Sequence, residues 1–469
     1  MARVLLIEPH DDLKNNEFRR ERINTPINLV YLGTAIEDKH EVKIYDRNIY
    51  PHDEDYTKLL KEYKPDIIGL TSMTTPMLHD VMHLGKLTQS VLEGAIIVVG
   101  GIHASVDPDS VLKEPYIDYI IRGEGEEAFL EFCDTFDKNP KKLGKLKNVN
   151  KNPLRPFIDV AKLKLPNYDL LELKKYGHIY VVLSRGCSGN CTFCCSTRSW
   201  GVNGKPCVRS YTSEQMIEFF RKLIEKYKIK TFSIADDNFL SNREQTIEVC
   251  KYLKNKGVHF FCFARADDLD NEVLKVLKDA GCHTIQIGIE SGSQRVLNFL
   301  NKRTTIQQNI DAVKKCMRHG ITCDASFMVG LPTETVEEIN MTLNFVKKYK
   351  PDLPNAKIYL PLPGAPLFDY CVSRSLITKP ETLEEWVKWT GNTLKIEVKH
   401  KVSEIPDEHI IRTIQKIIST GFHRNKIKRL RYWLNVGDYR HILKSAKRFL
   451  IWRDGVVLPF IGMRNFKNS

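Results

Sequence analysis

Short apolar runs alternate with amphipathic stretches through the first third of the chain. Runs of Val, Ile and Leu bounded by turn residues are typical of buried strands, and apolar positions at helical spacing are typical of surface helices. The pattern predicts strands at residues 3–8, 41–45, 66–72, 95–101 and 119–122, with helices near 28–38, 56–63, 77–92 and 126–136. This alternation predicts an α/β fold with a doubly wound parallel sheet, whose ligands bind at the carboxyl ends of the strands.

The alternation resumes in the middle of the chain and gives six further units. The predicted strands lie at residues 179–183, 230–235, 260–265, 284–290, 323–330 and 357–362, and a helix follows each of the first five. Six such units predict a partial (βα)6 TIM-like barrel with its site at the C-terminal ends of the strands. We divide the chain into residues 1–139, a Lys-, Pro- and Asn-rich linker at 140–175, the barrel at 176–370, and a mainly helical, basic region at 371–469.

Composition adds boundary conditions to this picture. The chain has 469 residues and 42% hydrophobic content, which suits two or three domains with proper cores. The sequence begins directly on a predicted strand and has no apolar run of about 18 residues, so we expect neither a signal peptide nor a transmembrane helix. Twelve cysteines without a secretion signal indicate a cytoplasmic location. The net charge of +13 favours an anionic partner.

Three cysteines on one loop carry the most specific chemistry. Cys187, Cys191 and Cys194 form C-x3-C-x2-C directly after the apolar run at 179–183. Three thiolates are one fewer than the four that usually close an iron–sulfur cubane, which leaves one iron open for a substrate or cosubstrate. The alternative is a structural zinc knuckle in which Cys195 or Cys207 supplies the fourth ligand.

The cysteine motif resembles that of the radical S-adenosylmethionine (radical SAM) family, in which an aromatic residue, here Phe193, usually precedes the last cysteine. The resemblance implies that Cys187, Cys191 and Cys194 hold a [4Fe-4S] cluster and that Phe193 belongs to the cofactor site. In that family SAM chelates the open iron and is cleaved reductively to a 5′-deoxyadenosyl radical, which abstracts hydrogen from the substrate. The cofactors supply the difficult chemistry and the protein orients them. An electron donor such as flavodoxin or ferredoxin is then required.

Polar residues close the predicted barrel strands where such a site would lie. The same resemblance implies that Asp237 contacts the SAM amino group, that Arg265 contacts its carboxylate or ribose, and that Glu290 or Ser291 binds the ribose hydroxyls. A guanidinium suits a carboxylate partner because of its planar donor fork. Asp237 could instead cap the helix that follows it.

Three loops follow predicted strands of the N-terminal domain and look shaped for a ligand. Their candidate residues are Ser72, Thr74, Gly100, Gly101, His103, Gly123 and Glu124. Placed before a radical SAM motif, these loops resemble the cobalamin-binding domain of cobalamin-dependent radical SAM methyltransferases and anaerobic cyclases. The resemblance implies that they surround the corrin and its nucleotide tail. The alternatives are a degenerate domain or one that binds another nucleotide-like group, and His103 could touch the corrin edge or cap a turn.

One position departs from cobalamin domains that ligate cobalt through a histidine. Asn48 stands where that histidine would be. An amide is a poor cobalt ligand, so we predict cobalamin bound without a lower axial histidine.

The C-terminal region is basic and aromatic. Ten Lys and Arg residues lie between Arg424 and Arg453, interleaved with Trp433, Tyr439, Phe449 and Trp452. This pattern is compatible with a solvated helix face, with peripheral contact to an anionic membrane, and with a nucleic-acid backbone, of which nucleic acid is the least expected. Burial is the expected role of Trp386 and Trp389, with a substrate pocket as the alternative.

Three functional hypotheses follow. The first is a cobalamin-dependent radical SAM methyltransferase that methylates an unactivated carbon of a small-molecule or lipid substrate. The second keeps the [4Fe-4S] cluster, SAM and cobalamin but catalyses an oxidative cyclisation or rearrangement. The third is a non-enzymatic, metal-containing protein that binds a membrane or nucleic acid.

Overall fold

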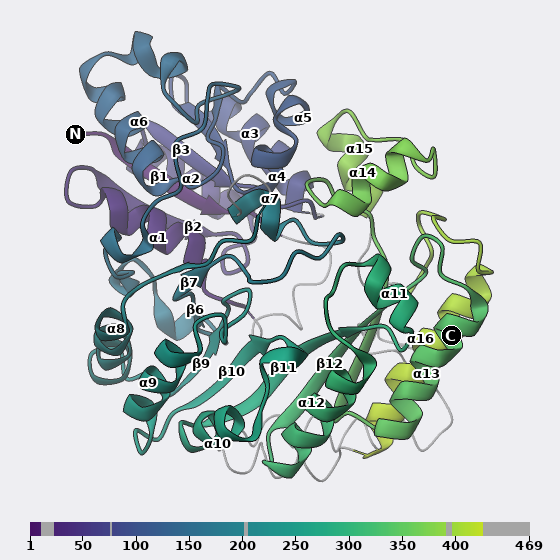
Figure 1. Ribbon diagram of the computed structural model, residues 1–469. Helices are drawn as coiled ribbons and strands as arrows, with labels where there is room; N and C mark the ends of the chain where they lie inside the picture. Colours follow the sequence, from purple (N-terminus) through teal and green to yellow (C-terminus); the bar gives the residue numbers. More distant parts are fainter. Residues whose placement is uncertain (11–22, 76, 201–204, 391–395, 425–469) are drawn as a thin grey trace, which may run out of the picture.

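The computed structural model describes residues 1–10, 23–75, 77–200, 205–390 and 396–424, and it contains two parallel sheets (Figure 1). The first sheet has the order β2-β1-β3-β4-β5 and consists of β1 (Arg3–Glu8), β2 (Glu41–Asp46), β3 (Ile67–Thr71), β4 (Ile96–Gly100) and β5 (Tyr119–Ile120). All its ladders are parallel. Every residue of β3 is buried, as expected for a parallel strand covered on both faces.

Helices cover both faces of this sheet. They are α1 (Ile27–Ile36), α2 (Asp53–Tyr63), α3 (Met77–Val91), α4 (Ile102–Val106), α5 (Pro108–Leu112) and α6 (Glu126–Lys138). Helices α1 and α6 share one apolar core with the sheet, and α2 and α3 share another. The strand order reverses between β1 and β3, which is the switch point where open α/β sheets bind ligands. The predicted doubly wound sheet is confirmed.

The second sheet is an open half-barrel of six parallel strands in the order β13-β12-β11-β10-β9-β6. The strands are β6 (Tyr180–Val181), β9 (Thr231–Ile234), β10 (His259–Ala264), β11 (Cys282–Glu290), β12 (Thr322–Val329) and β13 (Leu353–Ile358). Its helices are α7 (Ser196–Trp200), α8 (Ser213–Glu225), α9 (Arg243–Leu253), α10 (Asn271–Asp279), α11 (Gln294–Phe299), α12 (Ile306–Arg318) and α13 (Val336–Tyr349). Capping boxes at Thr212, Thr305 and Thr335 define the starts of α8, α12 and α13.

The first and last strands of the half-barrel differ from the prediction. The chain leaves β6 after two residues, and β7 (Ser184–Arg185) instead pairs antiparallel with β8 (Arg209–Ser210). Strand β13 begins four residues before the predicted start at 357. Strand β13 also ends at Ile358 and not at the predicted 362, because Pro361 lacks the N–H that a strand donates. Pro354 is tolerated within β13 because β13 is an edge strand.

Residues 140–175 pack against both cores. They form short 3-10 turns at Pro140–Lys145, Val160–Lys162, Tyr168–Leu170 and Leu173–Lys175. Leu143 and Val149 join the core beneath α1 and α6, while Val160 and Tyr168 join the half-barrel core. The segment that we interpreted as a linker is thus an extended contact between the two sheets.

The C-terminal helices divide between the two sheets. Helices α14 (Pro366–Ser373) and α15 (Leu383–Thr390) join the core of α2 and α3, whereas α16 (Asp407–Arg424) packs on β13 and α13 (Figure 1). Trp386 is fully buried, and its indole N–H donates to Asp107 at 2.6 Å. Trp389 is half-buried and donates to the Pro361 carbonyl. The predicted burial of Trp386 is confirmed.

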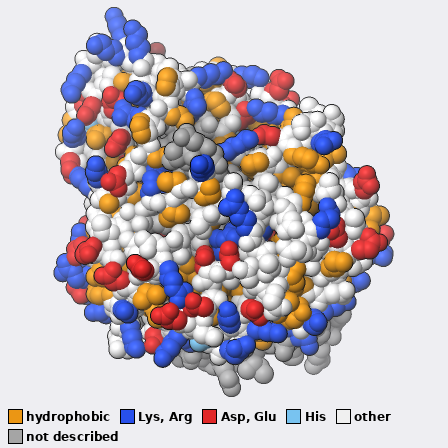
Figure 2. All heavy atoms as spheres, in the orientation of Figure 1, with side chains coloured by type: hydrophobic (Ala, Val, Ile, Leu, Met, Phe, Trp, Pro, Cys, Tyr) orange, Lys and Arg blue, Asp and Glu red, His pale blue; other side chains and the backbone are white. Residues whose placement is uncertain are grey.

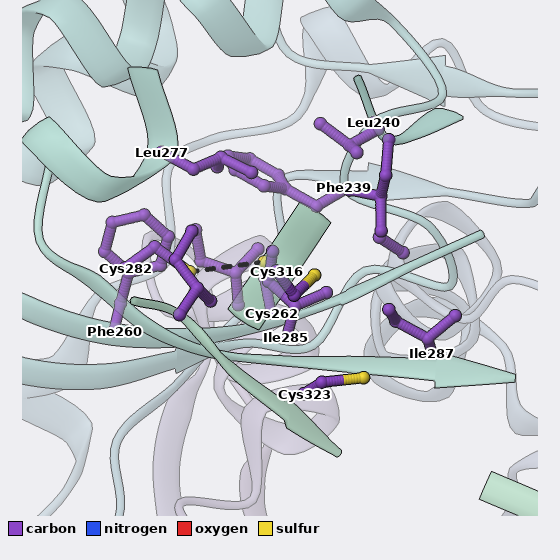
Figure 3. Close-up of a cluster of buried hydrophobic side chains, with 14 of the residues drawn as sticks. Phe239, Leu240, Phe260, Cys262, Leu277, Cys282, Ile285, Ile287, Cys316 and Cys323 are labelled. Atoms are coloured by element: carbon purple, nitrogen blue, oxygen red, sulfur yellow. Dashed lines mark hydrogen bonds between the residues drawn. The ribbon is translucent and has the colours of Figure 1, made fainter. Parts of the chain in front are cut away.

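A group of thiols fills part of the half-barrel core (Figure 3). Cys250, Cys262, Cys282, Cys316 and Cys323 are all buried, and the sulfur atoms of Cys262 and Cys282 lie 3.9 Å apart. Burial raises the pKa of the Cys250 thiol, and the hydrogen bond with Cys282 together with burial raises the pKa of the Cys262 thiol, so both are protonated and behave as small apolar side chains. These buried thiols therefore contribute to the packing of the half-barrel core.

Charged side chains of both signs are interspersed over the visible face of the molecule (Figure 2). No helix within the described part of the chain is long and apolar enough to cross a membrane. The basic cluster from 425 to 453, with its four aromatic residues, lies outside the described residues. Its predicted contacts stay predictions.

Tyr168 tests whether the 140–175 segment is part of the fold. Its ring is fully buried and stacks on Phe219, and its hydroxyl donates to the Tyr180 carbonyl. We expect Tyr168→Ala to lower the free energy of unfolding by about 3–5 kcal/mol because it empties a packed site. Tyr168→Phe should cost about 1 kcal/mol, since only the hydrogen bond is lost. Urea unfolding followed by circular dichroism measures both, and a neutral Tyr168→Ala would show that the segment does not pack.

Candidate functional site

The cysteine loop is held by backbone groups from distant parts of the chain. Thr192 N–H donates to the Leu300 carbonyl at 2.9 Å, and the Thr192 carbonyl accepts from Leu367 N–H at 2.7 Å. The Asn190 carbonyl accepts from the Asn301 amide at 2.7 Å. These bonds satisfy a loop that has little regular structure of its own. They fix the three cysteines against the turn after α11 and the start of α14.

The three thiols share a mostly desolvated environment. Cys191 is 8% exposed, and Cys187 and Cys194 are half-buried. Burial raises the pKa of all three thiols, to about 12 for Cys194. Backbone N–H groups of Gly189 and Ser196 point at the sulfur atoms of Cys187 and Cys194, at 3.3 and 3.4 Å. A thiolate formed on metal binding would find these donors already in place.

Two buried cations flank Cys191. The Arg265 guanidinium lies 3.9 Å from the Cys191 sulfur and donates to the Lys302 carbonyl at 2.8 Å. The charges of Lys302 and Arg265 oppose the rise that burial causes in the Cys191 pKa. The side chains are 8–9% exposed, so these charges are weakly screened.

The donor set fits an iron–sulfur cluster with an open iron. Within the described residues, no three cysteine, histidine or carboxylate side chains converge closely enough to hold a single metal ion. A cubane does not need such convergence, because each of its three cysteine ligands binds a different iron. Three thiols, two N–H donors and two fixed cations suit a bulky, negatively charged cluster better than one zinc ion.

Lys302 was missed by the sequence analysis. Its ammonium forms an ion pair with Glu290 at 2.8 Å, and it lies 5.8 Å above the Phe193 ring. The chain reverses near it, with Glu290 at φ +63° and Asn301 at φ +49°. A lysine after a short helix gives no sequence signal of burial, because lysine is almost always exposed.

The two aspartates after β9 form hydrogen bonds with residues on either side of the cysteine motif. Asp236 is buried and accepts from Leu183 N–H at 2.7 Å and from the Ser184 hydroxyl at 2.6 Å. Burial raises its pKa to about 7. Asp237 accepts from the Ser196 hydroxyl at 2.9 Å, and burial raises its pKa as well. The capping alternative for Asp237 is wrong, since Asn242 caps α9.

The hydroxyl of Ser291 forms its hydrogen bonds with Thr342 and Ser293, not with the cysteine thiols. Ser291 is fully buried, its hydroxyl lies 3.3 Å from that of Thr342, and it accepts from Ser293 N–H. This hydroxyl therefore serves the contact between the start of α11 and α13. Glu290, one residue earlier, is the member of the pair that reaches Lys302.

The Ser/Thr and Gly-Gly loops of the first sheet interlock. The Ser72 hydroxyl donates to the Gly100 carbonyl at 2.6 Å, and Ala104 N–H donates to Ser72. Gly101 has φ +94°, and a Cβ there would lie 2.5 Å from the Ser72 carbonyl oxygen. Only glycine fits such a close approach. The two loops therefore form one rigid rim at the carboxyl ends of β3 and β4.

His103 is held inside this rim. Its Nδ1 lies 2.9 Å from the Thr74 hydroxyl, and its Nε2 lies 3.1 Å from the Ser110 hydroxyl. It is fully buried and packs edge-on against Trp386, 5.6 Å between ring centroids. Burial lowers its pKa to about 4, so it is neutral. These contacts hold His103 inside the protein, and its two predicted roles, touching the corrin edge or capping a turn, stay predictions.

The Gly123-Glu124 turn faces the half-barrel. Gly123 has φ +73° and donates to the Ser105 hydroxyl at 2.9 Å. The Glu124 carboxylate accepts from Arg185 at 2.7 Å, from Arg209 at 2.9 Å and from Ile158 N–H at 2.7 Å. Its side chain is 4% exposed. Glu124 is thus engaged by protein cations.

Asn48 forms a local turn. Its amide and its backbone N–H both donate to one Asp46 oxygen, at 2.9 and 2.8 Å. Burial raises the pKa of Asp46 to about 6.

Segments that adjoin the two candidate sites come together around Gly364. A Cβ at this glycine would lie 2.7 Å from Val106, at the end of α4, and 3.5 Å from the Cβ of Cys195, which follows the cysteine motif. The segments that follow the Gly-Gly loop and the cysteine motif therefore border the same residue.

Comparison with known proteins matches this arrangement. Residues 181–346 match the model of the radical SAM superfamily, and residues 19–132 match the B12 binding domain. The chain is 33% identical over 422 residues to the uncharacterized methyltransferase PH0819 of Pyrococcus horikoshii, covering 86% of this chain and 88% of that protein. It is 29% identical to the anaerobic magnesium-protoporphyrin IX monomethyl ester cyclase of Rubrivivax gelatinosus, covering 65% of this chain and 58% of the cyclase.

The fold also resembles a solved structure. The radical S-adenosylmethionine methyltransferase TsrM of Kitasatospora setae, solved with tryptophan substrate and a SAM analog, superposes with a TM-score of 0.67 at 16% identity, covering 81% of this chain and 78% of that chain. This likeness supports the two-sheet architecture.

The chain belongs to the family of radical SAM enzymes that carry a B12-binding domain. The two domains assign a [4Fe-4S] cluster, SAM and cobalamin as its cofactors. Such enzymes require a small-molecule substrate and a reductant.

Gly101→Ala tests the interlocked rim. We expect a lower unfolding midpoint than for Gly94→Ala, which shares a positive φ of +86° but has no atom within 4 Å of the added Cβ. Both substitutions place an L-residue at positive φ, but Gly101, at φ +94° and ψ −175°, lies in a region that only glycine normally occupies, and only Gly101→Ala adds the clash with Ser72. Thermal unfolding of both variants measures the difference. Equal midpoints would show that the rim is not tightly closed.

Asp236 predicts a pH dependence of the metal-free protein. Its folded-state pKa of about 7 lies above the ordinary value of 3.8, so the folded state retains a proton that the unfolded state releases. Stability therefore falls as the pH rises from about 4 to about 7. We expect Asp236→Asn to flatten this slope, measured by urea midpoints at several pH values under reducing conditions. Asp279→Asn, at an exposed position on α10, is the control that should leave the slope unchanged.

Proposed function

We propose that this protein is a cobalamin-dependent methyltransferase that transfers a methyl group to an unactivated carbon of a small-molecule or lipid substrate. The observation that supports the proposal is that Val106, which follows the Gly-Gly loop, and Cys195, which follows the cysteine motif, both border Gly364. A methyl carried on one cofactor can reach a carbon activated at the other only if the two sites face each other. The relative named as a methyltransferase matches 86% of this chain, both domains included.

The three cysteines would hold the cluster, which supplies one-electron cleavage of SAM when bound. Arg265 and Lys302 offset the negative charge that three thiolates bring into a desolvated loop. Asp237, which lies beside Ser196 and the cysteine loop, is the proposed partner of the SAM amino group. Arg265 is the proposed partner of the SAM carboxylate. Phe193 contributes an apolar wall beside Lys302.

The residues further along play supporting parts in this proposal. The Glu290 carboxylate orients Lys302, and the Ser291 hydroxyl fixes α11 against α13. In this proposal Glu290 stays paired with Lys302 and Ser291 stays bonded to Thr342. For cobalamin, backbone of Gly100 and Gly101 offers the closest approach. Ser72, Thr74 and His103 hold that backbone rigid, and Gly123 with Glu124 closes the rim toward the half-barrel. Asn48 supports binding without a lower axial histidine.

A cyclisation is the second candidate reaction, favoured by the similarity to the anaerobic cyclase of Rubrivivax gelatinosus. The non-enzymatic hypothesis is set aside because the chain belongs to an enzyme family. We further propose flavodoxin or ferredoxin as the electron donor. A cytoplasmic location and peripheral contact of the basic segment with an anionic membrane complete the proposal.

The products of SAM distinguish the two reactions. After anaerobic reconstitution with iron, sulfide and cobalamin, we expect mass spectrometry to detect 5′-deoxyadenosine, together with S-adenosylhomocysteine only when cobalamin is present. 5′-Deoxyadenosine alone would favour cyclisation and contradict methyl transfer.

Matched cysteine variants test the cluster assignment. Cys191→Ala should abolish formation of both SAM products because the cluster loses a ligand. Cys195→Ala, an adjacent thiol outside the motif, should retain them. Retained SAM cleavage in Cys191→Ala would refute the assignment of the three cysteines.

A further inference from the structure

Four charged side chains, Arg185, Arg209, Glu124 and Glu126, form a buried salt-bridge network between the two sheets. Arg185 on β7 pairs with Glu124 at 2.7 Å and with both oxygens of Glu126. Arg209 on β8 pairs with both oxygens of Glu124, at 2.9 Å each. The two arginines face each other across the β7–β8 ladder, where Arg185 is the register partner of Arg209. Glu124 and Glu126 come from the turn that opens α6 in the first sheet.

The salt-bridge network has two positive and two negative charges, so its net charge is zero, and it is mostly desolvated. The four side chains are 4–14% exposed. The guanidinium of Arg185 also lies 5.6 Å from the Tyr31 ring on α1, and the Tyr31 hydroxyl donates to the Val182 carbonyl. Removing charges from water is costly, and buried pairs of this kind are weak evidence for stability. Their directional bonds do fix geometry, because bidentate arginine–carboxylate contacts allow little rotation.

The salt-bridge network connects the start of the cysteine motif to the rim of the first sheet. Arg185 stands two residues before Cys187, the first cysteine of the motif. Glu124 belongs to the turn that closes the rim of the first sheet, where Gly123 N–H donates to Ser105 at the end of α4. A shift of Arg185 would therefore move the cysteine loop relative to that rim. Sequence motifs alone assigned Glu124 to the cofactor and gave Arg185 no role.

We propose that Arg185 is a positioning residue that sets the separation and orientation of the cluster relative to cobalamin, through Glu124 and Glu126. The inference rests on the proposed function in that both cofactors must act on one substrate. Arg185 itself touches neither reacting atom in this scheme. Its effect is transmitted through the backbone from Arg185 to Cys187.

The test compares Arg185→Met with Arg295→Met in the full chain loaded with both cofactors. Arg295 pairs with Glu338 between α11 and α13 and contacts neither the rim nor the salt-bridge network. Iron and cobalamin content are measured first. The main readout is the electron paramagnetic resonance spectrum of the reduced protein, in which the spins of the cluster and of cob(II)alamin interact according to their distance and orientation.

We expect Arg185→Met to retain both cofactors but to change or lose the spin–spin splitting, while Arg295→Met keeps the wild-type spectrum. The ratio of S-adenosylhomocysteine to 5′-deoxyadenosine should fall by about tenfold or more, because a small misplacement disrupts a step that needs both cofactors. A wild-type spectrum and an unchanged product ratio in Arg185→Met would overturn the inference.

A second variant covers the case in which Arg185→Met fails to fold. Glu126→Gln removes one of the two ion pairs of Arg185 from the side of the first sheet and leaves the sequence of β7 and the cysteine loop unchanged. It should alter the splitting in the same direction, and an unaltered spectrum in this variant would equally overturn the inference. The spin readout does not depend on methyl transfer. A wild-type enzyme that makes no S-adenosylhomocysteine would therefore refute the proposed function without deciding the role of Arg185.

Discussion

The need to bring three thiols together in a desolvated loop governs much of this structure. A thiol buried among apolar groups resists ionisation, and Cys187, Cys191 and Cys194 are all shifted in that direction. The surrounding protein counters this with two N–H donors and the charges of Arg265 and Lys302. The loop itself supplies few of its own bonds. It depends on β9, on the turn after α11 and on the start of α14, which come from three separate parts of the chain.

The sequence was informative where chemistry or periodicity is local. The C-x3-C-x2-C motif, the buried strands β1, β3 and β4, and the interlocking glycine at 101 all carry signals within a few residues. Such patterns identify the fold class because parallel strands covered on both faces are uniformly apolar. The alternation of strands and helices then indicates that both sheets are parallel, and the structure adds the order of their strands.

What the sequence did not reveal depends on distant contacts. The burial of Lys302 depends on two residues that are close to it in space. Its ammonium pairs with Glu290, and its carbonyl accepts from Arg265. Glu124 looked like part of a ligand loop, and its arginine partners lie 61 and 85 residues away. The displacement of β13 reflects its place at the sheet edge, where Leu353 and Pro354 can enter the ladder. None of these features has a local pattern.

The chain connects its two sheets more than once. Residues 140–175 pack on both cores on the way into the half-barrel, and α14 and α15 return to the core of α2 and α3 on the way out. Thr25 also pairs with His178 and Tyr180, through bonds of 3.0 and 2.9 Å. A molecule tied at both ends of its second domain has no single hinge about which the halves could swing apart. Entry of a substrate and release of a product must then come from loops that move while the scaffold keeps the two sheets together.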